Sequence, residues 1–322
     1  MTRTVPTLLA LFFLPATIAL QARAESNQDL PPADSIKPEL YATGFEFSEG
    51  PALDREGNLY VVNYRGNGNI GRITPDGTAS VFCDLREMAP LKGREPRANG
   101  LKVDSQGRLI VADYGTARVL RIPPDGESVE VLAARCEGKR FGGINDVALD
   151  LEGNIYMSDP GGSSPEHPIG SIYRYDIRTA KVSRLDSGLI YPNGLAVTPD
   201  QKHLCLSESR LRQMLIYDLT PEGKAINRRV LTKLPGEEFV PDGMVFDKLG
   251  RLYVATWTAG VICVIEIPSG EILRQYDAGG NKVTNVHFFG DYLYTTVAAK
   301  EAVFRIKLGV PGFDYNRGMK NQ

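Results

Sequence analysis

Short stretches in which apolar and polar residues alternate recur along most of the chain, and Gly, Pro and Asp separate them. Within 109–132, the stretches 109–112, 119–122 and 129–132 are rich in β-branched residues, and the turn-forming run 124–126 divides the last two. Such runs predict short antiparallel strands joined by tight turns. No segment after residue 25 has a helical period, so we predict an all-β fold.

One longer pattern repeats six times along the chain. Each repeat has a polar residue, a small residue, an alternating apolar strand, an Asp-x-x-Gly-like turn and a second apolar strand. The polar residue that opens each repeat, called here the anchor, is Glu49, Asn99, Asn145, Asn193, Asp242 or Asn285. Steps between successive anchors are 50, 46, 48, 49 and 43 residues. A repeat of this length with about four strands is typical of a propeller blade.

The sixth repeat lacks a fourth strand, because the segments 285–289, 292–297 and 302–308 are followed by a polar tail. An unassigned strand-like segment, 39–42, precedes the first anchor. We therefore predict a six-bladed β-propeller over 37–310, with four antiparallel strands per blade and the last blade closed by the N-terminal strand. Ring closure would hide sheet edges that otherwise invite aggregation. Residues 25–36 are predicted to be a linker and 311–322 a C-terminal tail.

The first 24 residues have the pattern of a secretory signal peptide. Arg3 precedes an apolar run over 5–20, and the small-x-small sequence 22–24 provides a cleavage site before Glu25. The run is short for a membrane span, although an uncleaved anchor is the alternative. We therefore expect an exported protein, periplasmic or secreted, with no membrane contact after cleavage.

Composition narrows the class of protein. The chain of 322 residues is 42% hydrophobic and 24% charged, with a formal net charge of −2, which excludes a disordered or multi-span membrane chain and gives no electrostatic footprint for nucleic acid. We expect a monomer or a weak homo-oligomer. The four cysteines lack metal-type spacing. Export permits disulfides, but their apolar surroundings favour buried free thiols, with a Cys83–Cys136 bridge as the alternative.

The six anchors would open the inner strands of the blades, so their side chains should form a ring around the central channel. All six carry a side-chain oxygen, and burying such groups is costly unless a cation or hydrogen bonds satisfy them. Oxygen ligands suit a hard cation such as Ca²⁺, and the carboxylates of Glu49 and Asp242 would offset its charge. Glycines after four anchors permit close backbone approach. A water-filled polar channel without a metal, or anchors that are merely hairpin turns, are the alternatives.

Four of the anchors lie within short motifs, which are, in chain order, SEGP at 48–51, ND at 145–146, PNGL at 192–195 and PDGM at 241–244. This set resembles the metal-ligand motifs of the senescence marker protein/gluconolactonase family (regucalcin-like lactonases) and, more distantly, of the diisopropyl fluorophosphatases. The match covers nearly the whole mature chain. The resemblance implies a propeller with a catalytic divalent cation, usually Ca²⁺ although another divalent ion is possible, held by Glu49, Asn145, Asn193 and Asp242.

The resemblance also implies a reaction, the opening of a lactone, typically of a sugar, by cation-assisted attack of water. Asp242 is then the candidate general base, with a role as nucleophile as the alternative. Asn99 and Asn285, which are not among the four ligands, are interpreted as facing substrate or water, and Arg97 as a loop residue that shapes the substrate pocket.

His287 lies two residues after its anchor, where other repeats have an apolar residue such as Leu101 or Met244. We therefore include it among the candidate substrate-binding residues that face the channel, with a core histidine whose hydrogen bonds are satisfied as the alternative. A phosphotriesterase-like enzyme or a lactonase for non-sugar lactones is the alternative function within the same site. A non-catalytic propeller that binds a ligand on its loop face is a further alternative. The chain has no Gly-x-Ser-x-Gly motif that would favour a serine hydrolase.

Overall fold

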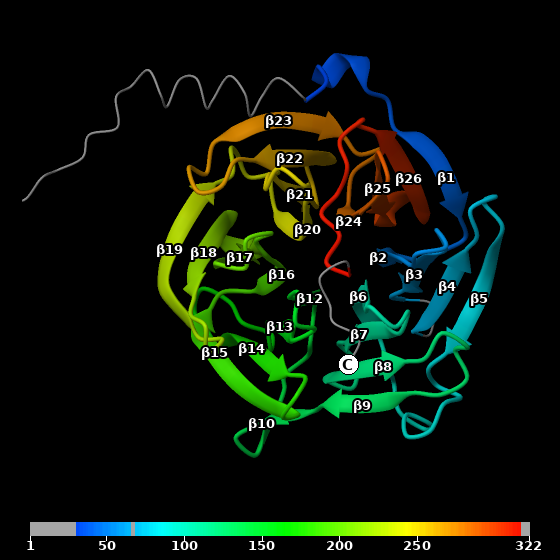
Figure 1. Ribbon diagram of the computed structural model, residues 1–322, viewed down its shortest axis with the longest axis vertical. Coiled ribbons are helices and arrows are strands. Elements are labelled where there is room, and N and C mark those ends of the chain that lie inside the picture. Colours follow the sequence, from blue (N-terminus) through cyan, green and yellow to red (C-terminus); the bar gives the residue numbers. More distant parts are fainter. Residues whose placement is uncertain (1–29, 66–67, 317–322) are drawn as a thin grey trace, which may run out of the picture.

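The computed structural model describes residues 30–65 and 68–316, and their strands form six four-stranded antiparallel sheets arranged around an axis (Figure 1). The predicted six-bladed β-propeller is therefore confirmed. The predicted signal peptide lies outside the described residues. In the described part of the chain, no helix has the length and apolar character needed to cross a bilayer.

Each blade runs from an inner strand at the axis to an outer strand at the rim. The first three blades are β2 (Ser48–Leu53), β3 (Leu59–Asn63), β4 (Asn69–Ile73) and β5 (Ala79–Asp84); β6 (Ala98–Val103), β7 (Leu109–Asp113), β8 (Arg118–Ile122) and β9 (Glu130–Ala133); and β12 (Val147–Leu149), β13 (Ile155–Asp159), β14 (Gly170–Asp176) and β15 (Lys181–Leu189). A two-stranded ribbon of β10 (Arg135–Cys136) and β11 (Lys139–Arg140) precedes the third blade.

The remaining blades have the same order. They are β16 (Pro192–Val197), β17 (His203–Glu208), β18 (Gln213–Leu219) and β19 (Ala225–Lys233); β20 (Pro241–Phe246), β21 (Leu252–Thr256), β22 (Val261–Ile265) and β23 (Ile272–Asp277); and β24 (Val283–Phe289), β25 (Tyr292–Val297), β26 (Ala302–Lys307) and β1 (Glu39–Thr43). Three single-turn 3₁₀ helices, η1 (Ala33–Ser35), η2 (Ser209–Leu211) and η3 (Ala298–Lys300), lie between strands or before them.

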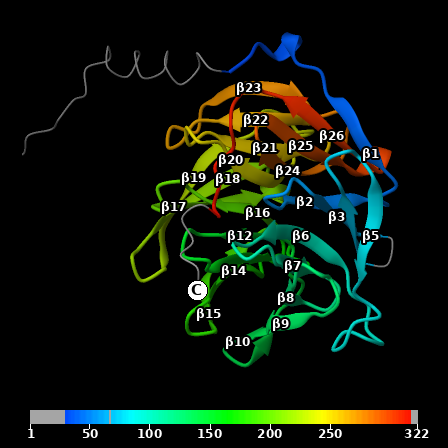
Figure 2. The same cartoon turned by 45° about the vertical axis from the view of Figure 1, so that its right-hand side comes forward.

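The N-terminal strand closes the ring, as the sequence predicted. β1 pairs antiparallel with β26, so the first and last strands of the propeller share one sheet (Figure 2). At the axis, the Thr284 hydroxyl donates to the Ser48 carbonyl at 2.8 Å, which joins the sixth blade to the first. These contacts join residues more than 230 positions apart in the sequence.

The Asp residues in the Asp-x-x-Gly turns hold the turns together. Asp54 Oδ1 accepts a hydrogen bond from the Asn58 amide at 2.8 Å, and Asp247 Oδ1 accepts from the Arg251 amide at 2.9 Å. The turn glycines have positive φ, +85° at Gly57 for example, a conformation that side chains with a Cβ adopt at a cost. Each such turn fixes the register between the first and second strands of its blade.

The hydrophobic core lies between blades rather than at the axis. Side chains from the first and second blades form one buried cluster that includes Tyr60, Val62, Leu101 and Leu109, and similar clusters fill the other interfaces. All four cysteines are buried free thiols, so the alternative Cys83–Cys136 bridge is wrong. Because apolar packing takes place between sheets, polar side chains can occupy the axis without disrupting the core.

Glycines beside the anchors allow the inner strands to converge. A Cβ added to Gly194 would lie 2.2 Å from the Asp242 carbonyl oxygen of the next blade, and one added to Gly50 would lie 2.2 Å from the Asn99 carbonyl oxygen. A Cβ on Gly243 would lie 2.0 Å from the side chain of Asn285. The space beside one anchor is therefore occupied by the next, as the sequence predicted from these small residues.

This crowding gives a test of the fold. Gly194→Ala should lower the free energy of unfolding by about 1–3 kcal/mol more than Gly77→Ala, because the new methyl group meets backbone atoms that cannot move independently. At Gly77 an added Cβ meets nothing within 4 Å, so that variant shows only the cost of a positive φ, about 1 kcal/mol. Urea unfolding of both variants measures the difference, and equal losses would contradict the close convergence of the inner strands.

Candidate active site

The six anchors are buried polar residues, five of them within inner strands and Asn145 just before β12. Exposed fractions are between 2% and 8% for the whole set, so these side chains see little bulk solvent. Backbone bonds link neighbouring blades at this level, such as that from the Gly100 amide to the Asn145 carbonyl at 3.0 Å. The fold therefore holds a ring of amides and carboxylates at one level of the channel.

Glu49 and Asp242 lie close enough for their charges to interact. Burial raises the pKa of Glu49 to about 8. A hydrogen bond from the Gly50 amide to Glu49 Oε2, at 3.0 Å, favours the charged form and so opposes that rise. Burial also raises the pKa of Asp242 well above its usual range, and the negative charge of Glu49 raises it further. The Asn193 amide lies near enough to Asp242 to stabilise its charged form. Three of the four predicted ligands thus act on one another.

A third carboxylate belongs to the ring, and sequence reasoning assigned it no role. Asp146 is 2% exposed and accepts a hydrogen bond from Asn285 Nδ2 at 3.4 Å and one from the Val147 amide at 2.8 Å. Its negative charge raises the pKa of Glu49 and of Asp242. The sequence feature that could have revealed Asp146 is its position, because an Asp follows Asn145 where four other anchors are followed by glycine. Asn285, predicted to face substrate or water, is engaged with Asp146.

The donor set fits a hard divalent cation. Glu49, Asn145, Asn193 and Asp242 offer only oxygen ligands, two of them carboxylates whose charged forms burial disfavours. A divalent cation would favour those charged forms and leave further coordination positions for water and substrate. Among the described residues, no three His, Cys, Asp or Glu side chains are arranged as a metal centre. A cation here would therefore depend on the two amide oxygens as well as on the carboxylates.

The loops above the ring are held by acidic residues at the ends of second strands. Asp159 accepts from the amides of Gly142 and Gly143 at 2.8 and 2.9 Å. Asp113 accepts from the Arg97 amide at 2.8 Å. Glu208 performs the same task in the fourth blade by accepting from the Ile190 amide at 2.7 Å. These carboxylates are occupied by backbone donors, so they position the loops around the ring.

Aromatic side chains gather beside these loops. The ring of Phe47 lies 5.3 Å from both Tyr64 and Trp257, and Tyr64 lies 6.2 Å from Tyr114. Burial raises the pKa of Tyr191 to about 12, and the nearby Tyr114, Asp242 and Tyr64 raise it as well. We call Phe47, Tyr64, Tyr114, Tyr191 and Trp257 the aromatic rim. Sequence reasoning missed the contribution of Tyr64 and Tyr114, whose signal was a Tyr directly after the second strand in two repeats.

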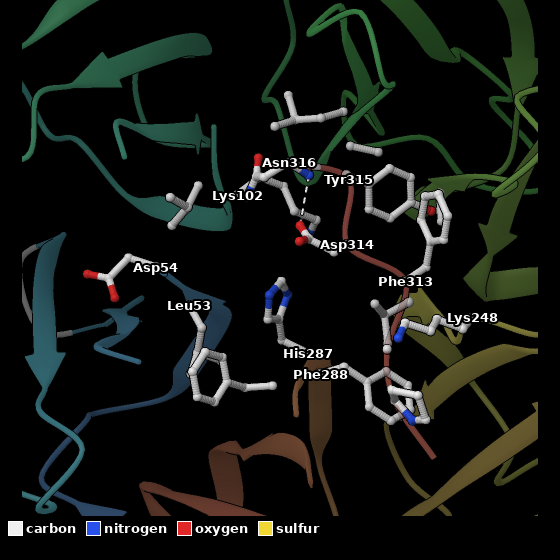
Figure 3. A pocket seen from close by; sticks show the side chains of 18 of the residues that line it. Leu53, Asp54, Lys102, Lys248, His287, Phe288, Phe313, Asp314, Tyr315 and Asn316 are labelled. Atoms are coloured by element: carbon white, nitrogen blue, oxygen red, sulfur yellow. Dashed lines mark hydrogen bonds between the residues drawn. The ribbon is translucent and has the colours of Figure 1, made fainter. Parts of the chain in front are cut away.

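The other predicted substrate residues lie at different levels. Arg97 is exposed beside Tyr64, whose pKa burial raises and the positive charge of Arg97 partly restores. Asn99 is buried at the ring, next to Gly50. His287 lies on the other side of the ring and lines a cavity of about 400 Å³ at the opposite end of the inner strands (Figure 3).

The structure corrects the sequence alignment of His287. His287 pairs with Tyr294 of the second strand. In the first two blades the residues at the position of Tyr294 are Tyr60 and Ile110, which pair with Ala52 and Lys102. The equivalents of His287 are therefore Ala52 and Lys102 rather than Leu101 or Met244. The inner strand of the last blade has one residue fewer between its anchor and this position. In the last blade, the residue two positions after the anchor therefore lies at the same level of the channel as the residue three positions after the anchor in the other blades.

Comparison with known proteins now assigns a family. The model of the SMP-30/gluconolactonase/LRE-like region matches residues 47–299, which is most of the propeller. The chain belongs to this family.

Individual members of the family give a more detailed comparison. The chain is 30% identical over 289 residues to a gluconolactonase of Zymomonas mobilis, covering 84% of this chain and 80% of the relative. It is also 30% identical over 264 residues to diisopropyl-fluorophosphatase of Loligo vulgaris, covering 75% and 82% of the two chains. A solved gluconolactonase structure from Xanthomonas campestris has the same fold, with a TM-score of 0.72, 24% identity and coverage of 85% and 89%.

The partly buried imidazole of His287 predicts a dependence of stability on pH. Burial, with a further contribution from the Lys102 charge, lowers the pKa of His287 from 6.5 to about 3. Below pH 6.5 the unfolded chain takes up a proton that the folded protein does not, so His287 should lower stability as the pH falls from 6.5 towards 3. Relative to His287→Gln, the native protein should lose about 1–2 kcal/mol of unfolding free energy between pH 7.5 and pH 5.

The measurement is urea unfolding of both proteins at the two pH values. Because other groups titrate in both proteins, only the difference between the two pH-dependent changes reports on His287. Parallel pH dependence in the two proteins would mean that His287 is protonated equally easily when folded and unfolded.

Proposed function

We propose that this protein is a lactonase of the gluconolactonase type that uses a bound divalent cation, Ca²⁺ in the first place. The observation that carries the proposal is the joint burial of the Glu49 and Asp242 carboxylates in a ring that also holds the Asn145 and Asn193 amides. Burial raises the pKa of Asp242, and the charge of Glu49 raises it further. Such a ring is unfavourable by itself and suits a cation. The similarity to a gluconolactonase and to a pentonolactonase of Haloferax volcanii supports a lactone as substrate.

The cation would be held by Glu49, Asn145, Asn193 and Asp242, and its chemistry is that of a Lewis acid that polarises the lactone carbonyl and offsets developing negative charge. The protein contributes the remaining elements. Its aromatic rim provides apolar surface against the substrate and limits access of water to the ring. Arg97, exposed beside the rim, can donate hydrogen bonds to substrate oxygens.

Asp242 is the proposed general base. Burial and the charge of Glu49 raise its pKa, and a bound divalent cation would oppose that rise and keep the carboxylate ionised, so that it could accept a proton from an attacking water. Removal of that proton would make the water the nucleophile that opens the ring ester and gives a hydroxycarboxylate. Attack by the Asp242 carboxylate itself, followed by hydrolysis of the resulting anhydride, is the alternative for the same residue.

A phosphotriesterase activity is the second candidate function. It is favoured by the 30% identity to a diisopropyl-fluorophosphatase over three quarters of this chain. Glucono-δ-lactone, an aliphatic lactone and a phosphotriester, each measured against its spontaneous rate, distinguish the two activities. Preferential acceleration of the lactones supports the first proposal, and preferential acceleration of the phosphotriester supports the second.

Removal and return of the cation is the first test of the proposed site. After treatment with a chelator, lactone hydrolysis should fall to the spontaneous rate, and Ca²⁺ should restore it. At a concentration one hundred times its Kd, Ca²⁺ should also stabilise the protein by about 2.7 kcal/mol, visible as a higher Tm. Glu49→Gln should reduce that thermal shift. Full activity in excess chelator would refute a cation-dependent reaction.

Replacement of Asp242 tests the catalytic assignment. Asp242→Asn should lower kcat/KM for glucono-δ-lactone by about 10³-fold or more, because it removes the base and one charge of the cation site. The matched control is Asp291→Asn, the same chemical change at an exposed turn between β24 and β25, which should leave the rate unchanged. Undiminished turnover by Asp242→Asn, assayed by titrating the released acid, would exclude Asp242 as base and as nucleophile.

A further inference from the structure

A cavity lies at the end of the channel opposite the aromatic rim. We call it the lower chamber: a space of about 400 Å³ between the far ends of the inner strands and the C-terminal segment 311–316. Figure 3 shows His287 projecting into its centre, with Lys102 and Asn316 on one side and Phe313 on another. The volume is within the range of small-molecule sites.

One register position of the propeller builds the inner wall of this chamber. At this position the second strands have Tyr60, Ile110, Tyr156, Cys205, Tyr253 and Tyr294, and the first-strand residues that pair with them are Ala52, Lys102, Ala148, Ala196, Val245 and His287. Four of the six are Ala or Val, and five of the six line the chamber. Two blades therefore place a polar side chain where the repeat otherwise has a small apolar one.

The polar atoms in the chamber are incompletely satisfied. His287 Nδ1 and Asn316 Oδ1 are buried and have no hydrogen-bond partner among the described residues. The Lys102 ammonium has three N–H donors, and the Leu101 carbonyl accepts from one of them at 3.1 Å. Buried polar atoms without partners are costly, so these groups call for a polar partner inside the chamber.

The charges that line the chamber favour an anion. Lys102, Lys248 and Arg55 contribute positive charge to the lining. Two carboxylates also line it, Asp54 in its turn and Asp314, which accepts from the Asn316 amide at 2.9 Å, so the cationic side chains outnumber the acidic ones by three to two. The charge of Lys102 also reaches the ring, where it opposes the rise in the pKa of Glu49 and of Asp146. A carboxylate would accept from Lys102 and gain a charge-assisted hydrogen bond.

The C-terminal segment supplies an apolar outer wall. The Phe313 amide donates to the Phe246 carbonyl at 3.0 Å, and the Lys248 amide donates to the Pro311 carbonyl at 3.1 Å. The rings of Phe313 and Tyr315 pack edge to face, 4.8 Å apart, and both line the chamber. An occupant would therefore meet a cation at one end and aromatic or aliphatic surface elsewhere.

We propose that the lower chamber is a second small-molecule site, separate from the ring of anchors, which binds a monocarboxylate with an apolar or aromatic group. The carboxylate lies against Lys102, and the apolar group lies against Val245 and Phe313. This site does not require the proposed lactonase activity, because its residues lie on the opposite side of the ring from the aromatic rim.

Phenylacetate is a suitable probe, and phenylacetamide is its uncharged counterpart of nearly equal shape. The chain has three histidines, so selective histidine labelling gives three imidazole signals in an NMR spectrum of the full-length mature protein. Only His287 lines the chamber, and His287→Gln identifies its signal. Phenylacetate should shift the His287 signal in a saturable way at concentrations up to about 10 mM, which detects any Kd of about 1 mM or tighter.

Charge recognition is tested with two comparisons. Phenylacetamide should bind at least about tenfold more weakly than phenylacetate to the unaltered protein. Lys102→Met should weaken phenylacetate binding by about tenfold or more, whereas Lys202→Met, the same change at an exposed turn, should have no effect. If Lys102→Met does not fold, the comparison of the two probes decides the question alone.

Three results would overturn the proposal: no shift of His287, equal binding of phenylacetate and phenylacetamide, or shifts confined to His167 and His203. Titrations with Ca²⁺ and with a chelator, run beside the lactone assay, separate this site from the proposed activity. Binding of phenylacetate by a protein without lactonase activity would support the chamber and refute only the proposed function. Lactonase activity without phenylacetate binding would do the reverse.

Discussion

The close convergence of six inner strands at one axis is the constraint on which the remaining structure depends. At Gly50, Gly194 and Gly243, the space that a Cβ would occupy is filled by backbone or side-chain atoms of the next anchor. The inner strands are therefore in contact around the axis, and little room is left for a hydrophobic core there. Apolar packing takes place between the faces of adjacent blades, and the axis is available for polar side chains.

This arrangement buries negative charge. Glu49, Asp146 and Asp242 come from three different blades, and burial raises the pKa of each. Such a site is a poor contributor to stability in the absence of a positive partner, since each charge disfavours the others. The same property suits a site that binds a cation and activates water, because the binding free energy of the ligand offsets a cost that the fold imposes.

Carboxylates at three positions of the repeat serve three different purposes, according to the donors around them. Asp54 in the turn accepts from backbone and side-chain donors of its own turn and fixes strand register. Asp159, at the end of a second strand, accepts from two loop amides and positions the loop above the ring. Asp242, at the anchor, faces other acids. A carboxylate surrounded by amide donors is structural, whereas one that faces other carboxylates has charge available for a ligand.

The sequence by itself determined the blades, the closing strand, the structural turns and the positions of the anchors. These features follow from short-range patterns repeated six times, and each repeat reports the same alternation and the same turn chemistry. Tertiary structure decided the rest. Asp146 joins the ring through contacts with residues of other blades, and Phe47 meets Trp257 across more than 200 residues. His287 shares a level with Lys102 because its inner strand is one residue shorter at that point, a fact of strand register that no local pattern contains.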